Sequence, residues 1–290
     1  MAFQIPLPEQ EVILPVTGKT VRIKALTVKE KLSIVESEIL TMSERLKFIT
    51  KLVYEKLADK EDFPNIQTFA SNIYESDLSA LVLGLMQTTY RKPYTFRVIC
   101  EQCGYVNIIE KPIGDTILDL RINQGGQDRF FNELHSVKDE ATGLQFVIRL
   151  PSVNDLIKGF KFAEENDINL LKESVKADNI DALILKMAPY LLLPAIVSIE
   201  LPDGNVLKND MSKSSMKTLL EFLMQLTEES LALPHEKLEE LRSRYKLVTG
   251  FKYICQNTQC ENHQQRKPST FTYDVLSEFF PIPIERLLSG

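Results

Sequence analysis

The sequence predicts an α+β fold built from two related βα halves, which share one site made of four cysteines. Three observations support this prediction. A segment near the start of the chain recurs in its middle, a short motif recurs towards the end of each half, and a pair of cysteines follows each copy of that motif. We expect the halves at 1–120 and 142–290, joined by a linker at 121–141 that contains paired glycines.

The two halves open with similar segments. TGKTVRIKALTVKEKL begins at Thr17 and TGLQFVIRLPSVNDLI at Thr142, and they align without a gap at a shift of 125 residues (142 − 17). In each segment a Thr-Gly turn precedes alternating apolar and polar residues, which predicts a strand. A hydroxyl residue, Thr27 or Ser152, then stands three positions before a carboxylate, as in a capping box. Each half is therefore expected to open with a turn, a strand and a capped helix.

Helices are expected to fill the interior of each half. SMKTLLEFLMQL, for example, repeats apolar residues at the spacing of one helical face. The second half is longer, and AIVSIELPDGNVLK accounts for part of the difference. Its alternating residues flank a Pro-Asp-Gly-Asn turn, which predicts an additional β-hairpin in that half.

Each half is expected to close with a strand that leads into a cysteine turn. FRVIC and FKYIC share the pattern F-x-x-I-C, and strand-like sequence also follows both cysteine pairs. Cys100 and Cys103 form a C-x-x-C-G knuckle, in which a tight turn directs two sulfurs at one ion. Cys255 and Cys260 form a longer knuckle with four intervening residues. Two such hairpins that close on one ion would make a zinc-ribbon-like site with zinc bound by four thiolates.

Other occupants of the four-cysteine site remain open. An iron–sulfur cluster also takes four thiolates, and His263, three residues after Cys260, could replace one of them. A thioredoxin-type redox pair is disfavoured because Gly104 leads into a strand, whereas that motif opens a helix. The sequence has neither a membrane-length apolar stretch nor a signal peptide, so we expect the chain in a reducing compartment, where thiols persist.

The composition and the motifs argue against two classes of function. A net charge of −6 and a pI near 5.3 disfavour a protein that mainly binds nucleic acid. We find no nucleotide-binding, nucleophile-elbow or metalloprotease motif, and a metal with four protein ligands has no open position for substrate. The sequence therefore predicts an interaction protein and not an enzyme.

The last twelve residues, 279–290, form an apolar tail with two prolines. So many large apolar side chains are expected to be buried, either on the chain's own hairpins or in a neighbouring subunit. We expect the tail to contribute to a subunit contact.

Four features together resemble the baseplate hub proteins of T-even-type tailed bacteriophages. They are LPVTGKTVRIKALTVKEKL, the CEQCG knuckle, LPSVND, and a late cysteine knuckle that runs on to FFP. The resemblance implies a structural protein of the tail baseplate hub or a factor that assembles it, in the virion and in the host cytoplasm during assembly. It also implies other tail proteins as partners in a multi-subunit assembly, without nucleic acid or stable membrane insertion. The alternative is a zinc-ribbon adaptor in transcription or replication, which would need a basic, aromatic face.

Overall fold

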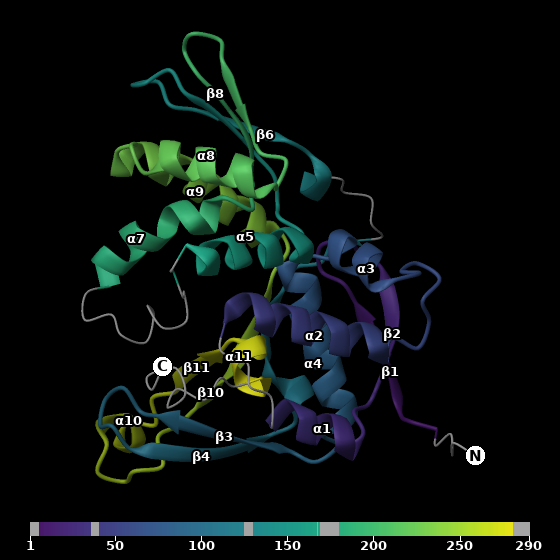
Figure 1. Ribbon diagram of the computed structural model, residues 1–290. Coiled ribbons are helices and arrows are strands. Elements are labelled where there is room, and N and C mark those ends of the chain that lie inside the picture. The colour runs from purple at the N-terminus through teal and green to yellow at the C-terminus, as the bar shows by residue number, and fades with distance from the viewer. Residues whose placement is uncertain (1–5, 36–40, 125–129, 167, 169–179, 281–290) are drawn as a thin grey trace.

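The computed structural model describes residues 6–35, 41–124, 130–166, 168 and 180–280, and over this part the chain is a mixed α+β protein (Figure 1). A four-stranded sheet lies at one end of the molecule in Figure 1, helices occupy the middle, and β-hairpins lie at the other end. None of the helices in the described ranges combines the length and the apolarity that crossing a membrane requires.

The first half contains two β-hairpins separated by four helices. Its elements in chain order are β1 (Glu9–Ile13), β2 (Thr20–Lys24), α1 (Val28–Val35), α2 (Met42–Lys56), α3 (Ile66–Asn72), α4 (Glu75–Thr89), β3 (Tyr94–Ile99), β4 (Val106–Lys111), a 3₁₀ turn (Ile113–Thr116) and β5 (Ile117–Leu120). β1 pairs with β2 and β3 with β4, all antiparallel. β5 pairs instead with β10 from the other half.

The second half has a four-stranded sheet and a three-stranded sheet. Its elements in chain order are a 3₁₀ turn (Phe130–Asn132), β6 (His135–Lys138), β7 (Gln145–Ile148), α5 (Val153–Glu165), α7 (Ile180–Leu192), β8 (Ile196–Glu200), β9 (Val206–Lys208), α8 (Lys213–Leu223), α9 (Glu228–Arg244), β10 (Leu247–Tyr253), α10 (Glu261–Gln264), β11 (Ser269–Tyr273) and α11 (Val275–Phe279). The sheet orders are β6-β7-β8-β9 and β11-β10-β5. β6 lies inside the stretch 121–141 that the sequence suggested as a linker.

The opening turns of the two halves have the same backbone geometry. The Gly18 N–H donates to the Leu14 carbonyl at 2.9 Å, and the Gly143 N–H donates to the Asp139 carbonyl at 2.7 Å. Both glycines have positive φ, +68° and +74°, which a residue with a Cβ rarely adopts. Each turn therefore needs its glycine.

The strand registers of the two opening hairpins are also equivalent. Val12 opposes Val21 in β1–β2, and Val137 opposes Phe146 in β6–β7, so both partners differ by 125 residues (137 − 12 and 146 − 21). Every described pair of β6–β7 has a counterpart in β1–β2 at this shift. The aligned sequences thus form hairpins with the same inward and outward side chains.

Both predicted capping boxes form. The Thr27 N–H donates to the Glu30 carboxylate at 2.7 Å, and the Glu30 N–H donates to the Thr27 hydroxyl at 3.3 Å. Ser152 and Asp155 exchange the same two bonds at 3.1 and 3.2 Å. α1 and α5 therefore begin where the sequence predicted, because each box satisfies amides that the first helical turn leaves free.

The described elements after these helices follow a similar order in both halves, although β8–β9, α10 and α11 occur only in the second half and β5 only in the first. Three further helices come next, and a hairpin with a cysteine knuckle closes each half. The predicted β8–β9 hairpin and the apolar face of α8 are both present, the latter with four buried residues: Met216, Leu219, Leu220 and Leu223.

Two large hydrophobic cores form, and the first is completed by the last described residues of the chain. Phe279 and Phe280 are buried among first-half residues, with their rings 5.3 Å from Tyr94 and 6.2 Å from Phe48, respectively, between centroids. The expectation of a subunit contact is therefore wrong for these two residues, since burial in their own chain already removes them from water. The rest of the tail, 281–290, lies outside the described residues.

A buried carboxylate ties the start of α4 to the turn after β1. Asp77 is fully buried and accepts hydrogen bonds from the backbone N–H groups of Val16 at 2.8 Å and Tyr74 at 3.3 Å, with Thr17 as a third donor. Burial raises the pKa of Asp77 to about 7, although the three amides act in the opposite direction.

The contribution of Asp77 to the stability of the protein is expected to fall as the pH rises from about 4 to 7. In this range the unfolded chain releases the proton, whereas the folded chain keeps it until its raised pKa of about 7. The contribution is fully present below the unfolded pKa and lost above the folded one, and it amounts to a few kcal/mol, on the order of 1.4 per pH unit. Denaturant unfolding of the wild type and of Asp77→Asn at pH 5 and pH 8 measures it. Equal pH dependence in both proteins would contradict the assignment.

Gly250→Ala is expected to destabilise the β10–β11 pairing. A Cβ at this position would lie 2.1 Å from the backbone carbonyl oxygen of Phe271, which cannot move without breaking the hairpin. Overpacking of this kind costs about 1–3 kcal/mol and sometimes more. Gly114→Ala is the matched control, since its nearest neighbour is a Gln87 side-chain nitrogen at 3.4 Å. Equal midpoints for both variants in urea unfolding would show that β10 and β11 tolerate the extra methyl group.

Candidate metal centre

The two closing hairpins pack against each other through aromatic side chains. Phe96 and Val98 from β3 form a small core with Phe251 and Tyr253 from β10. Phe96 and Phe251, the first residues of the two F-x-x-I-C motifs, have ring centroids 5.0 Å apart. This packing aligns the ends of β3 and β10, which is where the two knuckles begin.

The structure brings all four cysteines together. The sulfurs of Cys100, Cys103, Cys255 and Cys260 all lie within 4.8 Å of one another. The Sγ–Sγ distances are 3.9 Å for Cys100–Cys260 and 3.7 Å for Cys103–Cys255. Four thiolates around one ion with 2.3 Å bonds stand about 3.8 Å apart along a tetrahedral edge, so the spacing fits a single tetrahedral ion. A disulfide would need about 2 Å, and all four cysteines are unbridged.

The first knuckle is a tight turn built around Gly104. This glycine has φ +69°, and its N–H donates to the Cys100 carbonyl at 2.8 Å. The turn directs the backbone N–H of Tyr105 at the Cys103 sulfur. An amide in that position stabilises a thiolate, as a metal ligand requires.

The second knuckle accommodates its longer spacing with an additional turn. The Cys260 N–H donates to the Asn257 carbonyl at 3.0 Å, and Cys260 then caps the short helix α10. Backbone N–H groups again face the sulfurs, that of Asn257 at Cys255 and those of Asn262 and His263 at Cys260. The departure from C-x-x-C thus leaves the arrangement of amides around the sulfurs intact.

The thiols differ in their exposure to solvent and therefore in their acidity. Cys103 is exposed, and the Tyr105 amide lowers its pKa to about 7. Burial raises the pKa of Cys255 to about 12 and also raises that of Cys260. A bound cation would reverse the effect of burial, because its charge compensates the buried thiolates. The site therefore suits a cation and is poorly suited to thiolate chemistry at the buried sulfurs.

His263 supports the second knuckle from beside the cysteines. Its Nδ1 lies 2.5 Å from the Cys255 carbonyl oxygen. A carbonyl only accepts, so Nδ1 carries the proton in this contact. The ring is half-buried, and it holds the Cys255 backbone in place, whereas the four-sulfur cluster is complete without it.

Two polar residues that the sequence reasoning missed join the knuckles. The Asn107 amide donates to the carbonyls of Val98 and Tyr105, both at 3.1 Å, and accepts from the Gln256 N–H at 2.6 Å. The Gln256 side chain pairs with the N–H and the carbonyl of Ile108 at 3.0 and 2.9 Å. Asn107 occupies an inward position of β4. A polar residue at an inward strand position needs a hydrogen-bond partner, and this could have identified Asn107 from the sequence.

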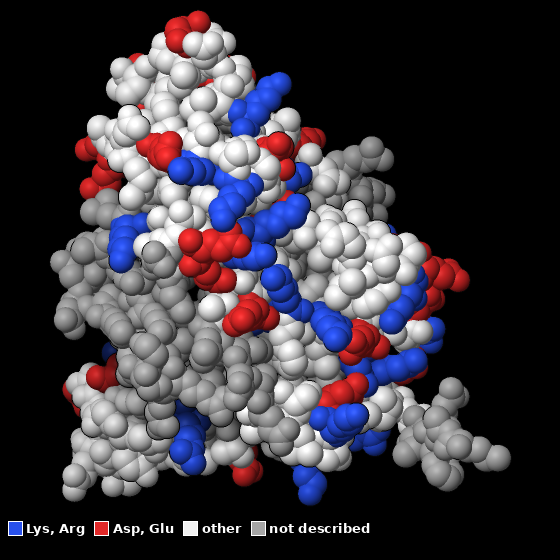
Figure 2. Space-filling model, viewed as in Figure 1, with Lys and Arg blue, Asp and Glu red and all other residues white. Residues whose placement is uncertain are grey.

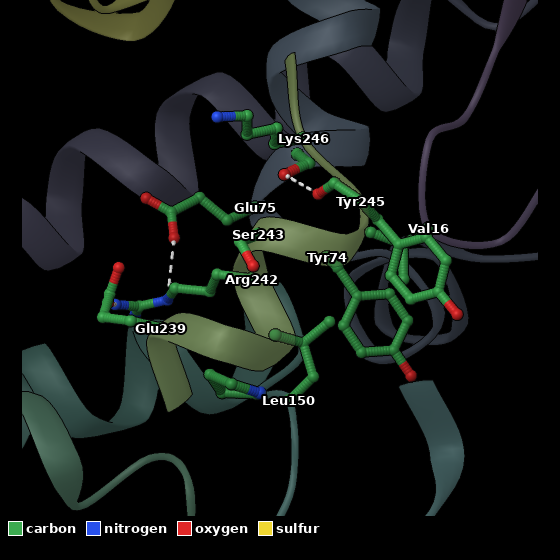
Figure 3. A pocket seen from close by; sticks show the side chains of 11 residues that line it. Val16, Tyr74, Glu75, Leu150, Glu239, Arg242, Ser243, Tyr245 and Lys246 are labelled. Carbon is green, nitrogen blue, oxygen red and sulfur yellow. Dashed lines mark hydrogen bonds and ion pairs between the residues drawn. The ribbon is translucent and has the colours of Figure 1, made fainter. Parts of the chain in front are cut away.

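A separate pocket of about 250 Å³ lies where α4 and α9 meet (Figure 3). Arg242 points across it to Glu75 at 3.8 Å and also pairs with Glu239 at 2.7 Å. The Ser76 hydroxyl donates to the Tyr245 carbonyl at 2.9 Å. These contacts of Glu75 and Ser76 with Arg242 and Tyr245 join the start of α4 in the first half to the end of α9 in the second.

Comparison with known proteins identifies a related family. A family model described as T4 bacteriophage base plate protein matches residues 7–280, from just before β1 to the end of the first core. No curated protein and no solved structure matches the chain. The family match spans both opening hairpins and both cysteine knuckles, which are the features on which the architecture rests, and it covers nearly the whole chain. The chain therefore belongs to the T4 bacteriophage base plate protein family.

Proposed function

We propose that the chain is a structural protein of the baseplate hub, or a factor that assembles the hub, and that it acts through protein–protein contacts. The match to the base plate family over residues 7–280 carries this proposal. The cysteine cluster supports it, because a closed four-thiolate site stabilises a fold and offers no open position for catalysis. The partners are other tail proteins, first during assembly in the host cytoplasm and then in the virion.

Zinc is the proposed ion, with Cys100, Cys103, Cys255 and Cys260 as its ligands. The spacing of the sulfurs supports this choice: two pairs are 3.7 and 3.9 Å apart, close to the edge of one tetrahedral centre, and all four lie within 4.8 Å of one another. In a cluster of several irons the thiolates bind different metal atoms and so stand farther apart. Bound zinc would supply charge compensation and rigidity, while the residues of the two knuckles orient the sulfurs.

We also propose that the two halves derive from an internal duplication. Equivalent turns, registers and capping boxes at a constant shift of 125 residues support it, as does the common order of elements. The first half is proposed to span 1–120. The second half, first placed at 142–290, is extended at its start to include β6 (His135–Lys138). Zinc would then join the same position of two related units, as in a zinc ribbon.

The distribution of charge favours this role over a nucleic-acid adaptor. On the face in Figure 2, Lys and Arg side chains lie among Asp and Glu side chains and do not gather into one basic patch. In the described part of the chain several exposed basic side chains form ion pairs, such as Lys19 with Asp62 and Arg149 with Asp155, both at 3.0 Å. Interspersed charge of this kind offers no track for a phosphate backbone.

Complementation of a phage that lacks this protein tests the proposal. A tagged copy is expected to restore tail assembly and to co-purify with baseplate intermediates at a fixed ratio. Retention in finished tails would identify a structural subunit, and presence only in intermediates an assembly factor. Normal tails without the protein, together with its co-purification with a polymerase, would replace the proposal by the adaptor.

A further inference from the structure

Two strand edges face a groove beside the metal centre. Among the described strands, β3 pairs only with β4, and β11 pairs only with β10. A groove of about 690 Å³ is lined by the consecutive residues 97–99 of β3 and 269–272 of β11. Each of these strands therefore has one edge without a β-partner in the described part of the chain, and both edges border the same groove.

The hydrogen bonds of Gln256 show which backbone groups of β3 face this groove. Because Gln256 binds both the N–H and the carbonyl of Ile108 on the outer side of β4, Ile108 bonds nothing on β3. Opposed residues in an antiparallel pair alternate between two bonds and none, so its partner Arg97 forms no ladder bond. The N–H and carbonyl groups of Arg97, and of Thr95 and Ile99 two residues away, point away from β4.

The side chains next to this edge include an apolar strip and two positive charges, and the acidic Glu101 also lines the groove. Ile99 is 66% exposed, and Val106 and Ile108 beside it on β4 are 48% and 47% exposed, which makes an apolar strip on the outer face of the hairpin. Arg97 and Lys267 line the groove without an ion pair in the described residues. Arg97 is a charge of the kind that natural sheet edges carry against unwanted pairing, but the exposed Ile99 lies only two residues away on the same edge.

We propose that the groove binds an extended segment of a partner baseplate protein, which adds as a strand to the free edge of β3. The segment would carry apolar residues at alternate positions, to continue the strip from Ile99, and an acidic residue for Arg97 or Lys267. An extended polypeptide is the occupant that fits, because a backbone offers a donor and an acceptor at every second residue, about 6.6 Å apart, which is the spacing of the free groups of Thr95, Arg97 and Ile99. This inference rests on the proposed function and specifies its mode of contact.

Proline substitution tests the edge selectively. Arg97→Pro removes an N–H that faces the groove but no bond of the β3–β4 ladder, and strands tolerate proline at such edge positions. Glu110→Pro is the matched control, since it removes the equivalent N–H from the opposite edge of the same hairpin. Arg97→Pro is expected to reduce incorporation into baseplate intermediates at least tenfold, and Glu110→Pro to leave it unchanged, with full metal content in both. Equal incorporation of the two variants would overturn the proposal.

Hydrogen exchange of the wild-type protein gives an independent readout. Peptides that cover Tyr94–Ile99 are expected to exchange more slowly in purified baseplate intermediates than in the free protein, while peptides from β4 stay unchanged. Unaltered exchange at β3 in the assembled state would overturn the proposal even if Arg97→Pro failed to fold. Slow exchange in the free protein together with dimerisation would identify a second copy as the occupant and also overturn it. Absence of the wild type from all intermediates would instead count against the proposed function.

Discussion

Replacement of Cys255 by serine is expected to release the metal and to produce the largest loss of stability of any single substitution considered. Cys255 is fully buried between the two hairpins, and its sulfur lies 3.7 Å from that of Cys103. Apparent binding free energies of structural zinc are about 10–16 kcal/mol in zinc-finger peptides, and binding to the folded state alone adds to stability. The metal content measured by elemental analysis should fall from one ion per chain to none, and the midpoint of thermal unfolding should decrease strongly.

Cys100→Ser is expected to have the same effect, and the double variant no further one. Each substitution destroys the same site, so the second has nothing left to remove. Thr258→Ser, on the exposed turn of the second knuckle, is the control and should retain the metal. Losses that add up in the double variant would mean that the two knuckles stabilise the protein separately.

Phe96→Ala is expected to destabilise the protein by about 3–5 kcal/mol, the range for a fully buried phenylalanine. The ring is 1% exposed and lies within 5.3 Å of those of Tyr94, Phe251 and Tyr273, measured between centroids. It packs between the two hairpins in the small core with Val98, Phe251 and Tyr253. Urea unfolding measures the loss of stability.

The metal should also be lost more readily from Phe96→Ala. The cavity left between the hairpins removes the packing that aligns the ends of β3 and β10, so a chelator should extract the ion faster than from the wild type. Phe96→Leu keeps most of the buried volume and should lie between the two proteins in both measurements. Chelator resistance equal to that of the wild type in Phe96→Ala would show that the knuckles hold the sulfurs without help from the aromatic core.

Local features of the fold and the cysteine cluster could be predicted because their determinants are short-range. Thr27 and Ser152 each act on a carboxylate three residues away, and the glycines of the turns set the backbone at their own positions. The four cysteines could be grouped because they are the only thiols in the chain and follow a repeated motif. Their clustering agrees with that prediction, while metal binding awaits its test.

Long-range pairings could not be predicted in the same way. β5 has no clear alternation, and its position beside β10 follows from the packing of the whole hairpin layer. Phe279 and Phe280 were expected to contact a neighbouring subunit because the sequence around them does not show that they complete the first core. Gln256 bonds the backbone of Ile108 at the edge of β4, but in the sequence it resembles any solvent-exposed polar residue of a loop. In each of these three cases the residue that forms the contact lies about 125 or more positions away in the sequence.

The distance in sequence between the knuckles fixes the order of events while the protein is being made. After Cys103 the ribosome adds 152 residues up to and including Cys255 (255 − 103), which at about 5–20 residues per second takes roughly 8–30 seconds. During that time the first thiol pair has left the ribosome without its partners, and the first core lacks Phe279 and Phe280. A chain that ends before Cys255 lacks both the second thiol pair and the two phenylalanines, so it could form neither the proposed metal site nor the complete first core. The metal content that the proposed site implies would therefore distinguish such fragments from chains that include both knuckles.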